Sequence, residues 1–294
     1  MIQVHATGDV EEYAAAAEPF LRADPCARNV LLTIIQNVRA AATGTYSGPP
    51  SFWWITDSDT VVGAASWTPP YNLLVSSLPT EAAPGLARAA VNRAIALGLR
   101  PLGVVGPAES ARVVAEAWTE ITDDTIERDR TILLNVLGSL VEVPMPPGAR
   151  RPARPDDVPV IAAWLEVFSA EIEHAAPANA HAMATRMVHG GQVDVWIDRD
   201  IVCMVGYRDA SGVLRVGPVY TPPEHRNHGY ARRLTYEVTQ EALQRPGIDR
   251  AMLFTDADNP VSNSIYRQAG YEPRGEHVEI DFAERAAEPL ESAP

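Results

Sequence analysis

TPPEHRNHGYA, residues 221–231, lies between a run rich in β-branched residues at 213–220 and a segment with apolar residues at helical spacing at 231–243. The stretch therefore predicts a strand, a tight loop and the start of a helix. A helix N-terminus presents unpaired backbone N–H groups and the positive end of the helix dipole, which attract phosphate. Gly229 lets the backbone approach a ligand closely, and Arg226 adds a permanent positive charge. These residues alone predict either an anion site suited to a pyrophosphate or an ordinary loop with a glycine.

Length, charge and cysteine content limit the class of protein. The 294 residues suffice for two domains that each bury a core. A formal net charge of −14 argues against a nucleic-acid partner and suits a cationic small molecule better. The first residues do not resemble a secretory signal, and no apolar run approaches the roughly 20 residues of a membrane span. For this reason no membrane partner is expected. Cys26 and Cys203 lie inside or beside apolar stretches without a CxxC spacing, which indicates buried reduced thiols in a cytoplasmic protein.

A proline-rich segment at 143–157 separates two patterned regions, so we expect a linker there and a boundary near residue 147. The predicted domains are 1–147 and 148–294. The patterns of the second domain predict a helix at 156–174 capped by Asp156 or Asp157, strands at 193–200, 201–209 and 213–220, a helix from Gly229, a strand at 250–257, a helix at 259–270 and a strand at 277–283.

The first domain follows a similar order, which indicates a divergent internal duplication. VVGAASW at 61–67 matches IVCMVGY at 201–207, and LGVVG at 102–106 matches MLFTD at 252–256. The stretch PTEAAPGLARAA at 79–90 has no Arg-x-x-Gly-x-Ala, so only the second domain is expected to bind an anion. The expected elements of the first domain are strands at 52–56, 60–70, 72–78, 102–106 and 128–137 and helices at 83–98 and 109–118.

Two motifs in this order, VYTPPEHRNHGYARRL at 219–234 and NPVSNSIYRQAGYEP at 259–273, resemble the GNAT superfamily of acyl-CoA-dependent N-acyltransferases. The resemblance covers about residues 148–283, and the first domain resembles a degenerate copy on pattern alone. It implies an α/β fold of tandem GNAT-like domains, each with a mixed, mostly antiparallel sheet, flanking helices and a splayed central strand pair. It also implies acetyl-CoA as the co-substrate.

The family's functional residues fall on both motifs. Val219 and Thr221 fall where a strand hydrogen-bonds pantetheine, and Tyr220 points to the other side by strand alternation. Asn259 falls on the asparagine that opens the later helix, and Tyr266 on a tyrosine near the thiol. Ala231 replaces a more common glycine, which the family tolerates. The coenzyme A pyrophosphate loop, with contacts largely through backbone amides, falls on Arg226, Asn227, His228, Gly229, Tyr230 and Ala231.

Acyl transfer to an amine needs an oxyanion donor, a proton for the departing thiolate and a free amine lone pair. Backbone N–H groups between Val219 and Thr221 suit the first role. The Tyr266 phenol suits the second, and the alternative for it is a tyrosine that packs in the core. The base stays open between Glu171 at a helix end near the expected acceptor site, Asp256 at a strand end and a water chain. The alternatives for the two carboxylates are a solvated helix end and a helix cap.

Histidines and a tryptophan are further candidates for a metal site and an acceptor pocket. His174, His181 and His189 have spacings of seven and eight residues, which match no common zinc pattern, so no metal is expected. The stretch 181–190 indicates an ordinary amphipathic helix. Trp196 is a candidate for lining an acceptor pocket, although core packing is the alternative.

Together these features predict an N-acetyltransferase whose second domain transfers an acetyl group from acetyl-CoA to a primary amine of a small molecule, a metabolite or an amine-bearing antibiotic. The alternatives are a protein lysine or N-terminal acetyltransferase, and a non-catalytic acyl-CoA-binding sensor or interaction module. Tyr266 argues against the sensor because a binding module needs no acid.

Overall fold

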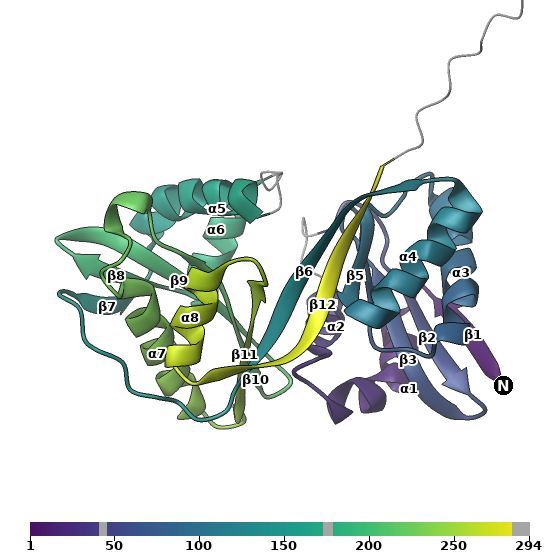
Figure 1. Cartoon of the computed structure of the whole chain (residues 1–294), viewed down its shortest axis with the longest axis horizontal. Coiled ribbons are helices and arrows are strands. Elements are labelled where there is room, and N and C mark those ends of the chain that lie inside the picture. The colour runs from purple at the N-terminus through teal and green to yellow at the C-terminus, as the bar shows by residue number, and fades with distance from the viewer. Residues whose placement is uncertain (41–45, 173–178, 284–294) are drawn as a thin grey trace, which may run out of the picture. The chain divides into compact units, whose positions relative to one another are not determined.

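The computed structural model in Figure 1 describes residues 1–40, 46–172 and 179–283. The chain divides into two compact units, a first unit of Met1–Ile132 with Gly275–Pro294 and a second unit of Leu133–Arg274. The chain passes from one unit to the other at residues 132–133 and back at 274–275, which differs from the single boundary expected near residue 147. The segment at 143–157, expected to be a linker, also contains a strand, β7 (Ala149–Pro152), which pairs antiparallel with β8. The linker was predicted because prolines are unfavourable inside a sheet.

In the first unit, the strands follow the order β1, β2, β3, β4, β5, β12, β6, and β4–β5 is the parallel pair. Helices α1 and α2 pack on one face through residues such as Tyr13 and Phe52, and α3 and α4 pack on the other through Leu86 and Trp118. The bounds are β1 (Ile2–Thr7), α1 (Val10–Ala23), α2 (Asn29–Arg39), β2 (Ser51–Asp57), β3 (Thr60–Trp67), β4 (Leu73–Val75), α3 (Ala83–Leu97), β5 (Gly103–Pro107), α4 (Ala108–Thr122), β6 (Thr125–Leu137) and β12 (Tyr271–Ala283).

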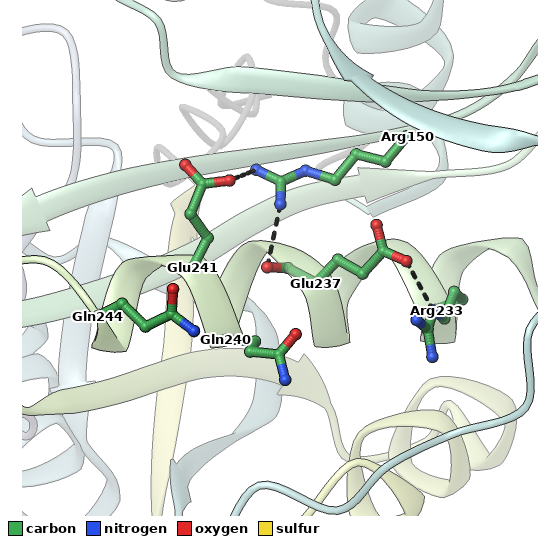
Figure 2. Close-up of a pocket in the computed structure, with 6 residues that line it drawn as sticks. All are labelled: Arg150, Arg233, Glu237, Gln240, Glu241 and Gln244. Atoms are coloured by element: carbon green, nitrogen blue, oxygen red, sulfur yellow. Dashed lines mark hydrogen bonds and ion pairs between the residues drawn. The ribbon is translucent and has the colours of Figure 1, made fainter.

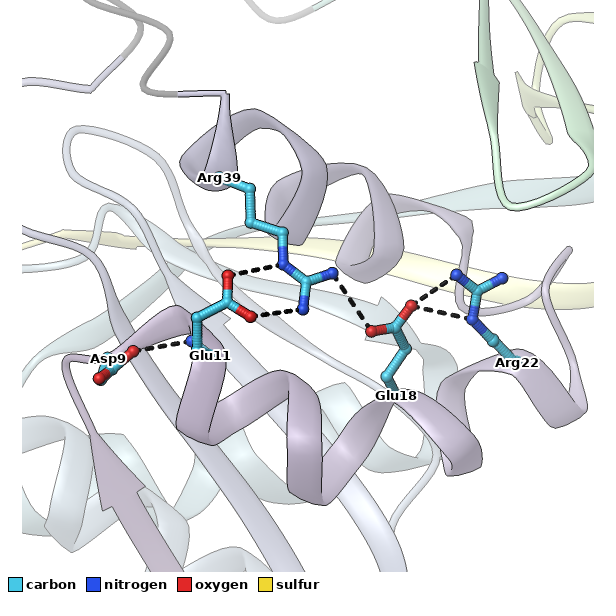
Figure 3. Close-up of polar contacts among 5 residues, drawn as sticks. All are labelled: Asp9, Glu11, Glu18, Arg22 and Arg39. Carbon is cyan, nitrogen blue, oxygen red and sulfur yellow. Dashed lines mark hydrogen bonds and ion pairs between the residues drawn. The ribbon is translucent and has the colours of Figure 1, made fainter.

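Charged side chains tie α1 to α2. The Arg39 guanidinium donates to both carboxylate oxygens of Glu11, at 2.9 and 2.7 Å, and to Glu18 at 3.3 Å (Figure 3). Asp9 caps α1 by accepting the Glu11 N–H at 2.8 Å. The elements expected for the first domain begin at residue 52, so β1, α1 and α2 are not among them. Across the described residues, no helix is long and apolar enough to cross a membrane.

In the second unit, β6 is followed by β11, β10, β9, β8 and β7, and β10–β11 is the parallel pair. Strand alternation divides the core: Val195 and Met204 face α5 and α6, whereas Trp196 and Cys203 face α7 and α8. The bounds are α5 (Val158–Ile172), α6 (Ala180–His189), β8 (Val193–Asp198), β9 (Asp200–Ala210), β10 (Val213–Tyr220), α7 (Tyr230–Leu243), β11 (Arg250–Asp256) and α8 (Pro260–Gln268).

The two units carry the same irregularity in equivalent hairpins. In β2–β3 the extra residue is Val62, and in β8–β9 it is Val202. Gly63 and Cys203, the next residues, therefore occupy equivalent positions. A bulge at the same point of both hairpins supports the duplication inferred from the sequence. It also fixes which residues of the two hairpins are equivalent.

Candidate functional site

Strands β10 and β11 run parallel and separate before their carboxyl ends. Their pairing begins at Val213 and ends where Val216 meets Leu253. There β10 places two residues, 217 and 218, opposite Gly206 of β9 before pairing resumes at Val219. Pro218 has no N–H to give to a ladder, and a Cβ on Gly206 would lie 2.8 Å from Pro218 Cδ, so only glycine leaves room for this bulge.

Beyond the bulge, β10 follows β9, and the described pairings give Val219 and Tyr220 no partner on β11. Val219 packs in the core beneath α7 and α8. Tyr220 faces the opposite side, as alternation predicts, and its ring centroid lies 5.8 Å from that of Trp164 on α5. The backbone groups at the end of β10 are therefore without a partner on β11, while the side chains on either face of the strand pack in the core.

The loop after β10 turns the chain into α7. The Arg226 guanidinium donates from Nε to the Thr221 carbonyl at 3.0 Å. Asn227 and Gly229 have positive φ values of 66° and 83°, and the first helical bond runs from the Arg233 N–H to the Gly229 carbonyl at 3.0 Å. Among the described residues, no acceptor is found for the amides of residues 229–231, so these N–H groups point out of the helix end.

Two aromatic side chains of this loop fix its position. The Tyr230 hydroxyl donates to Asp198 of the β8–β9 turn at 2.6 Å, and this hydrogen bond raises the pKa of Tyr230. The His228 ring stacks on the Tyr230 ring with centroids 5.4 Å apart. Tyr230 is almost fully buried, so its side chain anchors the loop and its backbone remains for a ligand.

The second helix at this edge, α8, follows β11 through a turn built by the predicted residues. Asp256 accepts the Asp258 N–H at 2.8 Å. Asn259 caps α8 by accepting the Ser262 N–H at 3.0 Å, and Asn263 donates to the Asp256 carbonyl at 3.1 Å. The structure therefore gives the Asp256 carboxylate and the Asn259 amide a role in this turn, and their roles in catalysis and cofactor binding stay predictions.

Tyr266 extends from α8 into the core between the sheet and helices α7 and α8. Its ring meets Tyr271 edge to face at 6.3 Å, and it shares a core cluster with Cys203 and Leu234. Burial raises the pKa of Tyr266, so the phenol keeps its proton at neutral pH and stays an acid. Tyr266 thus has the core-packing role that was the alternative prediction, and this packing also holds its ring in one orientation.

Of the side chains expected on the acceptor side, only that of Trp196 is described. Trp196 is fully buried and donates from Nε1 to the Pro147 carbonyl at 2.8 Å, so it packs in the core and lines no acceptor pocket. The side chain of Glu171 lies outside the described residues, as do Glu173 and His174. Within the described ranges, no three histidine, cysteine or carboxylate side chains gather as metal ligands.

A polar pocket of about 290 Å³ lies along α7 beyond its first turn (Figure 2). Arg150 donates to the Glu237 carbonyl at 3.1 Å and pairs with Glu241 at 2.7 Å, and it also meets the buried carboxylate of Asp194. Arg233 pairs with Glu237 at 2.7 Å. Because both guanidinium groups are already neutralised, this pocket is no anion site, and the network holds α7 against β7 and β8.

Within the described residues of the first unit, β4 and β5 stay paired, so the splayed strand pair expected in each domain is not found there. Leu74 pairs with Ser66 and with Val105, and no bulge interrupts β4. A Cβ on Gly106 would lie 2.5 Å from the Val75 carbonyl oxygen, so β4 and β5 stay together to their ends. Val75 takes the position of Val219, because each pairs with the equivalent residue of its hairpin.

The loop after β4 also lacks an anion cradle. Leu78 folds over Gly63, the position equivalent to Cys203, where a Cβ would lie 2.8 Å from the Leu78 Cβ. Helix α3 is preceded by Ala82 in a right-handed conformation, and Pro84 near its start has no N–H. Among the described residues, the exposed helix-start amides beside a glycine with positive φ are therefore found at α7 and not at α3, and anion binding by the second unit stays a prediction.

Comparisons with known proteins agree with this geometry. Residues 160–271 match the family described as acetyltransferase (GNAT) family. None of the curated proteins compared with the sequence matches it.

Solved structures similar to the chain extend over both units. A GCN5-related N-acetyltransferase from Sphaerobacter thermophilus has a TM-score of 0.61 at 18% identity, covering 96% of this chain and 95% of its own. A tandem GNAT protein from the clavulanic acid biosynthesis pathway has a TM-score of 0.55 at 14% identity, covering 98% and 100%. An acetyltransferase of the GNAT family from Colwellia psychrerythraea has a TM-score of 0.56 at 11% identity, covering 96% and 100%. The expected tandem GNAT fold is confirmed, and at these identities the likeness concerns the fold alone.

Proposed function

We propose that the second unit transfers an acetyl group from acetyl-CoA to the primary amine of a small molecule, and that the first unit is a degenerate copy. The observation that carries the proposal is the separation of β10 from β11 directly before the amides at the start of α7. In α/β proteins, ligands commonly bind in a crevice outside the carboxyl ends of the strands. The cysteines, both free and buried, fit the cytoplasmic location that we also propose.

The residues present fit acetyl-CoA. The amides of residues 229–231 and the Arg226 guanidinium suit the pyrophosphate, and the absence of a Cβ on Gly229 leaves them accessible. Backbone groups of Val219 to Thr221, without partners on β11, suit the amides of pantetheine. When bound, acetyl-CoA supplies the acyl group as a thioester.

The chain's own groups then have distinct tasks. A backbone N–H near Val219 would stabilise negative charge on the carbonyl oxygen as the amine nitrogen bonds to the acyl carbon. The carbon–sulfur bond breaks with its electron pair on sulfur, and Tyr266 gives sulfur a proton. The amine loses its proton to water, Asp256 or Glu171. Because the net charge of −14 favours cations, a protonated amine suits the protein's field.

The test is a calorimetric titration with acetyl-CoA followed by a thiol-release assay over a panel of small amines, aminoglycoside-type amines and a lysine peptide. Binding of acetyl-CoA with turnover on a small amine supports the proposal. A normally folded protein that binds no acetyl-CoA would contradict it. Binding without turnover on any amine would instead favour the acyl-CoA sensor, and turnover on the peptide alone the protein acetyltransferase.

A further inference from the structure

The side-chain hydroxyl of Thr221 is buried at the open edge of the separated strands. Among the described residues, it has no hydrogen bond within the usual geometric limits. The Arg226 guanidinium holds the backbone carbonyl of the same residue at 3.0 Å, so Thr221 is fixed while its hydroxyl stays unsatisfied. Buried polar groups without partners cost stability and are rare, so this hydroxyl requires an explanation.

Register places Thr221 on the same side of the sheet as Tyr266. Val219 pairs with Val205 and Tyr220 with Met204, so Thr221 lies opposite Cys203. The Cys203 thiol is fully buried in the cluster that contains Tyr266, and burial raises its pKa to about 12, an effect that a side-chain hydrogen bond with Thr221 opposes. A thiol is a weak hydrogen-bond partner, so this contact satisfies the hydroxyl only weakly. Thr221 and Tyr266 therefore lie on either side of Cys203, on the same face of the sheet.

We propose that the Thr221 hydroxyl donates a hydrogen bond to the sulfur of coenzyme A, beside the Tyr266 phenol. This role rests on the proposed function and adds a side chain where the motif implied only backbone contact. During transfer the carbon–sulfur bond breaks, sulfur keeps the electron pair, and Tyr266 supplies its proton. Thr221 keeps its own proton and stabilises the growing negative charge, since hydrogen bonds to charged acceptors are the stronger ones.

The experiment compares wild type, Thr221→Val and Thr221→Ser. Valine keeps the shape of threonine and removes the donor, whereas serine keeps the donor. Calorimetry measures the dissociation constants of coenzyme A and of desulfo-coenzyme A, which lacks the sulfur. In the wild type, coenzyme A should bind more tightly than the desulfo compound. Thr221→Val should abolish this difference without weakening desulfo-coenzyme A, and Thr221→Ser should retain it.

Turnover and stability supply two further readouts. Thr221→Val should lower kcat by about 10- to 100-fold, the effect of losing a hydrogen bond to a charged group. Its melting temperature should be equal to or higher than that of the wild type, because the free chain loses only an unsatisfied hydroxyl.

Equal weakening of both ligands by Thr221→Val, or an unchanged preference for the sulfur, would overturn the proposal. Because the ligand comparison needs no acceptor amine, it decides the role of Thr221 even where no turnover is found. A wild type that binds neither ligand would instead overturn the proposed function together with this role.

Discussion

Replacing Gly229 by alanine tests whether the start of α7 is the pyrophosphate site. Gly229 has φ 83°, and Gly247, in the turn between α7 and β11, has φ 85°. A Cβ at Gly229 would have only the Arg232 guanidinium nearby, at 3.6 Å, and a Cβ at Gly247 would have nothing within 4 Å. Gly247→Ala is therefore a matched control with the same backbone strain and no ligand.

The two substitutions should cost the same stability. Holding an alanine in the left-handed region costs about 1 kcal/mol, which lowers the melting temperature by roughly 2–4 °C. Only Gly229→Ala also places a methyl group among the exposed amides. The loss of one hydrogen bond to a charged phosphate is about 1.5–3 kcal/mol, or an acetyl-CoA dissociation constant about 10- to 100-fold higher.

Thermal unfolding by circular dichroism and titration with acetyl-CoA measure the two quantities separately. We expect Gly229→Ala and Gly247→Ala to melt together and to differ in affinity by at least about tenfold. Equal affinities at equal stability would refute the assignment of the pyrophosphate to these amides.

Three further changes have definite expected outcomes. Tyr266→Phe should lower kcat by about 10²-fold or more and leave the acetyl-CoA dissociation constant nearly unchanged in titrations, since the ring packing remains. The Arg151 guanidinium lowers the pKa of the Asp157 carboxyl, so this pair stabilises the fold above the unfolded pKa of about 4 and ceases to do so as pH falls through the lower folded pKa. Arg151→Gln should therefore shift acid unfolding, followed by circular dichroism, to higher pH, and an unshifted midpoint would contradict this. Gly270→Ala should destabilise the fold by more than about 2 kcal/mol in urea unfolding, because φ is 98° and the new Cβ would lie 1.8 Å from a backbone oxygen, whereas Gly275→Ala meets nothing within 4 Å and should be nearly neutral.

Much of the fold follows from local patterns. The motif stretch 219–234 predicts the strand, loop and helix because a glycine with positive φ, two prolines and a helical period all lie within it. The helix at 259–270 is equally readable, since Asn259 caps it and Pro260 opens it. Strand β7 was missed because proline argues for a linker, although Pro152 ends an edge strand where no donor is needed.

The site was predicted less completely because its geometry depends on long-range pairing. Gly217 and Pro218 are consecutive in a predicted strand, and only the register with β9 shows that they form a bulge for which Gly206 makes room. The buried hydroxyl of Thr221 could not be found from its spacing, because its environment comes from Cys203 on another strand. Asp256 and Asn259 were predicted from a motif that does not separate a turn-building role from a chemical one.

The contrast between the two units supports a specific cause for the proposed restriction of binding to one of them. In the second unit the bulge at Pro218 ends the β10–β11 pairing one position earlier than the uninterrupted β4–β5 pairing of the first unit. Three separate features close the first unit: the contact of Val75 with Gly106, the side chain of Leu78 over Gly63, and the missing donor at Pro84. Because each blocks a different part of an extended ligand, we expect no single substitution in the first unit to create a second acetyl-CoA site there.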